Sequence, residues 1–336
     1  METWALLRNV WFLLVGVLLA GYSVLDGFDL GVGVLFPFLA RDEREKTFLV
    51  RSIGPVWDGN EVWLLTGGGA LFAAFPHAYA TVFSGFYLAL MLVLFSLILR
   101  AVSLEFRTHD GALKGLWEAA FVIGSLLPAL LFGVALGNVV VGVPIDAQME
   151  YAGNFFTLLR PLPLVFGLLG LAAFLLHGSA WAALKTSGAL QERARRTARK
   201  MTVLTGIFYL LSFVAVWIYL PGALKRIAAW IFAALVWLSL GFLISALKRR
   251  KDGRAFAFSS LIFLSLWGNI GAIHYPNLVR ATDPALSLTI TNSSSSALTL
   301  KVMLIIALVG MPLVIGYTIY AYRVFKGKAG LDEAGY

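Results

Sequence analysis

Long apolar runs separated by short polar segments make up most of the chain. Most of the runs exceed the roughly 20 residues that an α-helix needs to cross a bilayer. The pattern predicts an all-α polytopic membrane protein with about nine transmembrane helices in a single membrane domain. The predicted spans are residues 10–39, 53–75, 79–106, 116–143, 158–184, 201–220, 227–247, 256–274 and 300–324.

Basic residues alternate between the connections of these spans. The odd-numbered connections are rich in lysine and arginine, and the even-numbered ones are poor in them. Positively charged loops stay in the cytoplasm. The alternation therefore predicts an N-terminus outside and a C-terminus in the cytoplasm, which requires an odd number of spans. The first run carries acids near its middle and has no small-residue cleavage site, so we interpret it as a retained span.

Composition narrows the function classes. Of the 336 residues, 60% are hydrophobic and 13% are charged, and the mean hydropathy is +0.83. Soluble domains carry about 25% charged residues. The formal net charge of +9 comes from the loops between apolar runs, which argues against nucleic acid as a partner. The sequence has no cysteine, which excludes disulfides, thiol catalysis and cysteine-ligated metal centres.

Two acidic pairs interrupt the first two spans. Asp58 and Glu61 occur in GPVWDGNEVWLLTGGG, and Asp26 and Asp29 occur in GYSVLDGFDLGVG. Residues three apart lie on one face of a helix. Ionisable groups in hydrocarbon are costly unless they face protein or water. Both pairs are therefore candidate functional groups.

Arg100, near the end of the third span, completes a predicted polar cluster. Counting along the helices places Asp29 about 15 Å, Asp58 and Glu61 about 8 to 12 Å, and Arg100 about 9 Å from the cytoplasmic ends. We expect these four side chains to lie together, with Asp26 beside them. One arginine cannot neutralise three carboxylates, so at least one acid should be protonated, bind a cation or exchange protons. The alternative is a buried ion pair that only fixes helix packing.

The aromatic and glycine residues around these acids favour packing roles. Trp57 and Trp63 flank the second acidic pair, and large aromatic side chains between helices mostly pack. Gly67, Gly68 and Gly69 are expected to permit close approach of a neighbouring helix. They do not form a phosphate loop, because no Gly-Lys-Ser/Thr sequence follows them.

The four histidines do not offer a haem site. A bis-histidine haem between spans needs two axial ligands at matching depth. Only His77 and His274 are predicted on the same side, both at the aqueous edge. His109 lies in an inner connection, and His177 is interpreted as a hydrogen-bonded residue between helices. We therefore expect this chain to ligate neither haem nor metal.

The remaining polar residues receive structural interpretations. Residues 293–296, a serine run, are expected to cap the N-terminus of the ninth helix. Glu105 and Arg107 are interpreted as the solvated end of the third helix. Glu118 is either a partner of the fourth helix dipole or a proton entrance, and we favour the dipole.

Four segments resemble subunit II of the cytochrome bd quinol oxidases: GYSVLDGFDLGVG, GPVWDGNEVWLLTGGGALFAAFP, LRAVSLEFR and YPNLVRATDPALSLTITNSSSSALTLKVML. They extend from the first span to the ninth. The resemblance implies a heterodimer with a haem-bearing subunit I, in the cytoplasmic membrane of a bacterium or archaeon. Such a complex oxidises quinol, reduces O2 to water and takes protons from the cytoplasm. It also implies that subunit I binds two b-type haems and one d-type haem, so this chain is not catalytic alone.

The resemblance further implies a fold and a site. The fold would be two four-helix bundles, residues 1–143 and 158–275, plus a peripheral helix, residues 298–324. The site would be a cytoplasmic proton channel with Asp58 at its centre and Asp29 and Arg100 beside it. Membrane lipid, a structural quinone and small single-span accessory subunits are possible additional partners.

Without the resemblance, the residues are compatible with two other functions. A proton- or sodium-coupled secondary transporter would also use intramembrane acids, and would show discontinuous helices and inverted repeats. A purely structural partner of the haem subunit would need the acids only for helix packing.

Overall fold

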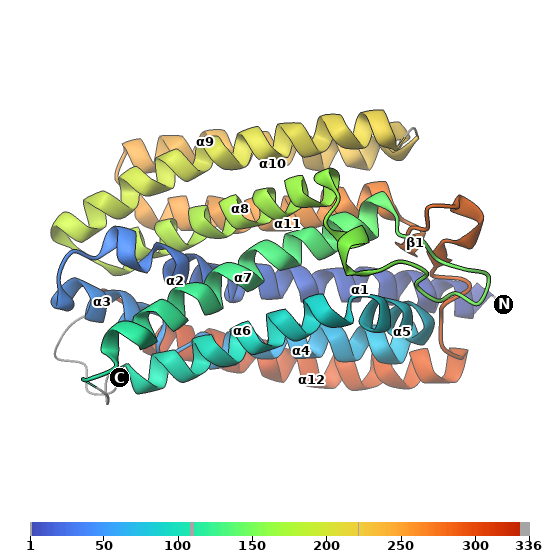
Figure 1. Cartoon of the computed structure of the whole chain (residues 1–336), viewed down its shortest axis with the longest axis horizontal. Helices are drawn as coiled ribbons and strands as arrows, with labels where there is room; N and C mark the ends of the chain where they lie inside the picture. Colours follow the sequence, from blue (N-terminus) through green and yellow to red (C-terminus); the bar gives the residue numbers. More distant parts are fainter. Residues whose placement is uncertain (1, 108–110, 221, 330–336) are drawn as a thin grey trace.

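The computed structural model describes residues 2–107, 111–220 and 222–329, so His109 lies outside the described residues. Long helices run side by side along one direction, and short loops and a small β-hairpin cover one end (Figure 1). The elements are α1 (Glu2–Leu25), α2 (Gly27–Leu39), α3 (Glu43–Ile53), α4 (Trp57–Ala74), α5 (Pro76–Gly85), α6 (Tyr87–Phe106), α7 (Lys114–Val141), η1 (Phe155–Leu158), α8 (Pro161–Lys185), α9 (Gly188–Tyr219), η2 (Ala223–Lys225), α10 (Ile227–Lys248), α11 (Asp252–His274), β1 (Asn277–Val279), η3 (Pro284–Leu286), β2 (Leu288–Thr289) and α12 (Ala297–Val324).

Eight helices within the described residues are long and apolar enough to cross a membrane, counting α1 with α2 as one span. This confirms the predicted all-α, multi-span class. The predicted span 53–75 corresponds to α4, which packs beside α1 and α12 in Figure 1. Asp58, Asn60 and Glu61 lower its hydropathy, so composition alone does not mark α4 as a span.

Three predicted spans are interrupted in the structure, contrary to expectation. The first breaks at Asp26, where α1 ends and α2 begins, and the third breaks at Phe86, between α5 and α6. In the second, α3 ends at Ile53 and α4 starts only at Trp57. Gly54 and Pro55 lie in that gap, and proline cannot donate the backbone hydrogen bond that would continue the helix.

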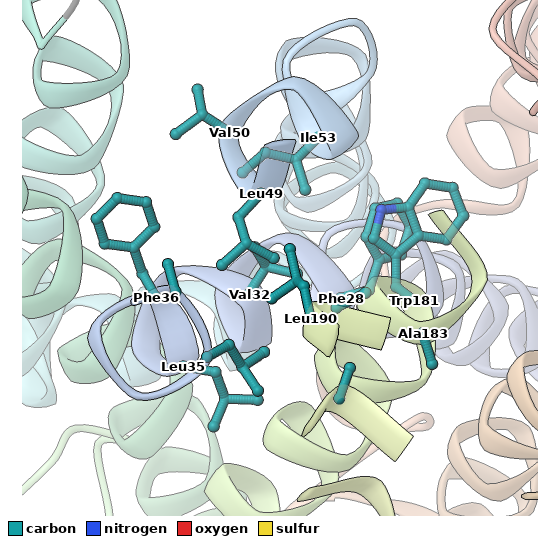
Figure 2. Packing of buried hydrophobic residues seen from close by; sticks show 14 of the residues in the cluster. Phe28, Val32, Leu35, Phe36, Leu49, Val50, Ile53, Trp181, Ala183 and Leu190 are labelled. Atoms are coloured by element: carbon teal, nitrogen blue, oxygen red, sulfur yellow. The ribbon is translucent and has the colours of Figure 1, made fainter. Parts of the chain in front are cut away.

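α3 lies across one end of the bundle, which we call the α3 end. Its apolar residues Leu49, Val50 and Ile53 belong to one buried cluster with Val32 of α2 and Trp181 of α8, and Leu49 points toward Val32 in Figure 2. The Trp181 indole also donates a hydrogen bond to the Ser52 carbonyl at 3.0 Å. Burial of these side chains fixes α3 against both helices.

α2 and α8 are in backbone contact. A Cβ on Gly31 would overlap the Phe174 carbonyl, and one on Gly178 would overlap the backbone of Gly31. Absent side chains at both positions let the two helix axes approach more closely than larger residues would allow. Since α2 also packs on α7, it joins helices from both predicted bundles, and the division into 1–143 and 158–275 stays a prediction.

α12 is at the edge of the bundle, where Figure 1 shows it beside α4. Of its residues, Leu300 alone is buried. Its N-cap is Ser296, whose Oγ accepts a hydrogen bond from the Thr299 backbone at 3.2 Å, as the serine run predicts. The hairpin of β1 and β2 precedes it and closes the end of the bundle opposite α3.

Candidate functional site

The centre of the site is an ion pair between Arg100 of α6 and Asp26 at the break between α1 and α2. Arg100 donates through Nη2 to Oδ1 at 2.7 Å and through Nη1 to Oδ2 at 3.1 Å. Both side chains are completely buried. Bidentate geometry of this kind gives a strong, directional pair.

Glu61 of α4 also contacts this guanidinium. Its Oε1 lies 3.2 Å from Arg100 Nη1, which is also bonded to Asp26. The Glu61 side chain keeps 24% of its surface exposed, whereas Arg100 keeps none. Glu61 therefore connects the buried pair with the exposed face of α4.

Asp29 of α2 is the second fully buried acid and is not paired with Arg100. Its Oδ2 accepts a hydrogen bond from Asn60 Nδ2 at 2.7 Å, and its Oδ1 has no hydrogen-bond partner among the described residues. Asn60 Oδ1 in turn accepts from the Tyr322 hydroxyl of α12 at 3.0 Å. Asp29 is thus held by a two-step hydrogen-bond chain that ends on the last helix.

The charges of this cluster do not balance. Asp26, Asp29 and Glu61 surround the single guanidinium of Arg100. Carboxylates so close together and so poorly hydrated cannot all be ionised without a large cost. Arg100 alone therefore cannot supply a counter-charge to each of the three carboxyl groups.

The helix break that positions Asp26 is fixed by two other helices. The Val24 carbonyl accepts a hydrogen bond from His177 Nε2 of α8 at 2.9 Å. His177 Nδ1 lies 2.7 Å from the Ser259 hydroxyl of α11, and the imidazole is completely buried. The Trp267 indole donates to the Ser23 hydroxyl at 2.9 Å. His177 is therefore a hydrogen-bonded residue between helices, as predicted.

Asp58 does not lie where the sequence places it. Because α4 starts at Trp57, Asp58 is in its first turn, not 8 to 12 Å inside a continuous span, and its side chain is exposed. The position beside Arg100 that we expected for Asp58 is taken by Asp26. Within this chain, Asp58 is at the rim of the cluster, one turn from Glu61.

Sequence reasoning also missed Asn60 and Tyr322. Asn60 is 2% exposed. Its position between the two acids of WDGNE was the signal that the sequence offered. Tyr322 comes from a helix 262 residues further on, and no local pattern links it to Asn60.

The predicted packing residues behave differently from one another. Trp63 lies against Gly21 of α1, where a Cβ would come within 2.6 Å of the indole, and Trp57 packs on the apolar cluster beneath α3. A Cβ on Gly67 would meet Leu19 of α1 at 3.0 Å. The expectation is wrong for Gly68 and Gly69 within this chain, because added Cβ atoms there would touch nothing.

A network of charged side chains covers the α3 end near the cluster. Arg107 is 5% exposed and pairs with Glu118 at 2.9 Å, so its interpretation as a solvated helix end is wrong. Glu118 also pairs with Lys46 at 2.7 Å. Glu43 contacts Lys46, Arg107 and Lys114, and the hydrogen bond from Lys114 is the main cause that lowers the Glu43 pKa to about 2.

The histidines among the described residues are His77, His177 and His274. Both ring nitrogens of His177 are engaged, and His274 Nε2 donates to the Leu278 carbonyl at 3.0 Å. His77 is exposed on α5. Within the described ranges, no group of three or more histidine and acidic side chains is arranged to hold a metal ion.

The fold and the cluster define a polytopic membrane subunit that buries excess carboxylates against one arginine. The chain belongs to the cytochrome bd terminal oxidase subunit II family, whose sequence model matches residues 7–325. The predicted resemblance is thereby confirmed.

Individual relatives agree along the whole chain. It is 36% identical over 370 residues to cytochrome bd-I ubiquinol oxidase subunit 2 of Escherichia coli strain K12, covering 99% of this chain and 98% of that protein. It is 36% identical over 343 residues to cytochrome bd ubiquinol oxidase subunit 2 of Bacillus subtilis strain 168, covering 98% of each. A chain of the solved bd oxidase from Geobacillus thermodenitrificans has the same fold, with a TM-score of 0.80, 19% identity, and coverage of 95% of this chain and 98% of that one.

Family membership has three direct consequences. The chain is a multi-pass protein of the bacterial inner membrane and a subunit of an oxidoreductase complex. It implies a subunit I partner, and haem in that partner. The secondary-transporter alternative is left without support.

Proposed function

We propose that this subunit supports the reduction of O2 to water by a haem-bearing subunit I and supplies protons to it from the cytoplasm. The observation that carries this proposal is the charge imbalance of three carboxylates around Arg100. Buried acids in excess of their counter-ions are typical of proton pathways in membranes. In the proposed topology the α3 end faces the cytoplasm, because the basic loops lie there.

The proposed pathway follows a gradient of exposure. Asp58 is exposed on the first turn of α4, and Glu61 follows one helical turn further with a quarter of its side chain exposed. Arg100, Asp26 and Asp29 beyond it are completely buried. Asp58 would collect protons at the rim, Glu61 would pass them inward, and the buried acids would hold them next to the partner.

The partner would supply the redox chemistry. We propose that subunit I binds two b-type haems and one d-type haem and oxidises quinol. In support, both ring nitrogens of His177 and Nε2 of His274 are already hydrogen-bonded within this chain. A structural quinone, lipid and single-span accessory subunits are further proposed partners, and none of them is needed for the proton pathway.

Substitution in the purified complex tests the pathway. Asp58→Asn and Glu61→Gln should each slow oxygen consumption while the haem absorption spectrum stays the same, because the iron sites lie in the partner. Asp252→Asn is a control for the loss of a carboxylate, since Asp252 pairs with Arg195 and with none of the cluster residues. Turnover equal to the unmodified complex in both pathway variants would contradict the proposal.

A structural role is the second candidate, because one observation favours it. The Arg100 and Asp26 pair is bidentate and completely buried, which is the geometry of a device that fixes helix register. This role predicts that Asp58→Asn and Glu61→Gln leave turnover intact and that only Asp26 and Arg100 variants lose assembly. The same set of variants therefore separates the two functions.

A further inference from the structure

The hydrogen-bond chain from Asp29 to α12 has a property that the proton pathway does not use. Asn60 is buried between Asp29 and Tyr322, with Nδ2 donating to Asp29 and Oδ1 accepting from the Tyr322 hydroxyl. An amide side chain has one donor end and one acceptor end, and rotation by half a turn exchanges them. The direction of the whole chain is therefore set by whichever neighbour can only donate or only accept.

The protonation state of Asp29 decides this direction. An ionised carboxylate only accepts, so it requires the Nδ2 end of Asn60, and the Oδ1 end then needs a donor on the far side. When Asp29 takes up one proton on Oδ2, that oxygen becomes a donor, and it is best satisfied by the Oδ1 end of a rotated amide. The Nδ2 end then faces Tyr322 and needs an acceptor.

Tyr322 satisfies both directions. A phenolic hydroxyl donates one hydrogen bond and also accepts. A residue that could only donate or only accept would oppose one of the two states. We propose that Asn60 and Tyr322 form a hydrogen-bond switch that reverses when Asp29 gains or loses a proton, and that α12 is thereby a working part of the proton cluster. This inference rests on the proposed proton pathway.

Among the groups around Asp29, Asn60 is the one that makes a hydrogen bond to its carboxyl group. The charged groups that face Asp29 are Asp26 at the helix break, Glu61 of α4 and Arg100 of α6, and none of them makes a hydrogen bond to it. From α8, His177 is occupied by Val24 and Ser259. Asn60 is thus the hydrogen-bond partner of Asp29 among the described side chains, and it is the group that responds when the proton lies on Oδ2.

Tyr322 is also placed to communicate with the α3 end. It lines a small cavity of about 20 Å³ together with Ser52, Trp181, Lys185 and Lys328. That space is enough for about one water molecule. A change in the direction of the Tyr322 hydroxyl would therefore reach the side of the molecule from which protons are proposed to enter.

The first test is the pH profile of oxygen consumption by the purified complex. Tyr322→Phe keeps the ring and removes the hydroxyl, which withdraws the donor that polarises Asn60 toward ionised Asp29. Loss of this donor should destabilise ionised Asp29 more than protonated Asp29, because hydrogen bonds to charged groups are stronger than those between neutral groups. The pH of half-maximal rate should therefore rise by about half a unit. Tyr320→Phe is the matched control: it removes a hydroxyl from the same helix on a 66% exposed residue and should leave the profile unchanged.

The second test observes the amide directly. In a complex with ¹⁵N in its asparagine side chains, the infrared difference spectrum between high and low pH should contain an isotope-sensitive amide signal. That signal should vanish in Asn60→Leu and in Asp29→Asn. An unshifted profile in Tyr322→Phe, or an amide signal that is absent from the unmodified complex or survives in Asp29→Asn, would overturn the switch.

The two levels of the proposal fail in different ways. If Asp29→Asn slows oxygen consumption but Tyr322→Phe behaves like Tyr320→Phe, the switch is wrong and the pathway stands. If Asp58→Asn, Glu61→Gln and Asp29→Asn all turn over at the unmodified rate, the pathway itself is wrong.

Discussion

Arg100 holds Asp26 with both terminal nitrogens at a point where the first membrane span is interrupted. The pair ties α6 to the junction of α1 and α2 in an environment with no solvent contact. This occupies one of three carboxylates and leaves Asp29 and Glu61 without a full counter-charge. The arginine therefore both fixes the break and creates the charge excess from which the proposed function follows.

Arg100→Gln is expected to destabilise the subunit strongly. It leaves Asp26 as a buried acid without its ion-pair partner, and breaking such a pair typically costs about 3–5 kcal/mol. Thermal unfolding of the detergent-solubilised complex should show a clear fall in Tm and a lower yield. Arg254→Gln removes an exposed arginine from α11 and should change the Tm little. Equal Tm values for the two variants would show that the pair is not important for stability.

Neutralising both partners should be less harmful than neutralising one. In Arg100→Gln with Asp26→Asn, residue 26 is no longer left as a buried charge without its partner, and the two amides can still hydrogen-bond. Part of the lost stability should return, since the penalty of a single variant comes mainly from the charge that is left behind. A double-mutant cycle on the Tm or on the denaturation midpoint measures the coupling. A double variant less stable than Arg100→Gln would refute this account.

The sequence predicts the helices better than their interruptions. Hydrocarbon thickness imposes a length on each span, so apolar runs identify most of them. The break at Asp26 occurs within a single predicted span, and His177 contacts it through a hydrogen bond to the Val24 carbonyl, from 153 residues away in the sequence. The gap before Trp57 has a local cause in Gly54 and Pro55. The prediction from hydropathy did not take these two residues into account.

For the site, too, the sequence predicts some features, and others depend on the folded chain. The spacing of the acids and the depth of Arg100 correctly suggested that carboxylates and one guanidinium would meet. Which acids meet Arg100 depends on where α4 begins and where α1 ends, so that Asp26 makes the bidentate pair and Asp58 lies in the first turn of α4. Tyr322 could not be predicted, because the position of α12 beside α4 is a property of the folded chain.

Gly31→Ala and Gly16→Ala should have opposite effects. A methyl group on Gly31 would overlap the backbone of α8, so the helices must separate, and overpacking of this kind typically costs about 1–3 kcal/mol. A methyl group on Gly16 would meet nothing, and alanine is the better helix former by up to about 1 kcal/mol. Parallel thermal unfolding of the two variants measures the difference. A Tm for Gly31→Ala at or above that of the unmodified subunit would show that α2 and α8 do not need this close contact.

Glu43 should make the stability of the α3 end depend on pH in the acid range. Its hydrogen bond from Lys114, supported by Lys46, lowers its pKa to about 2 in the folded state, below the ordinary value near 4.3. A carboxylate with a lowered pKa contributes its stabilisation in full above the unfolded value, and loses it as the pH falls toward the folded one. Because the side chain is 58% exposed, the contribution should stay below about 1 kcal/mol.

Glu43→Gln isolates this contribution. The variant should have a slightly lower Tm than the unmodified subunit at neutral pH, and the difference should shrink as the pH falls from about 4.5 toward 2. High salt should shrink it as well, since exposed pairs are screened. Glu150→Gln, which removes an exposed carboxylate from the loop after α7, serves as a comparison for the loss of a negative charge. A difference that grows on acidification would mean that Glu43 is stabilised in its protonated form, which the contacts with Lys46, Arg107 and Lys114 contradict.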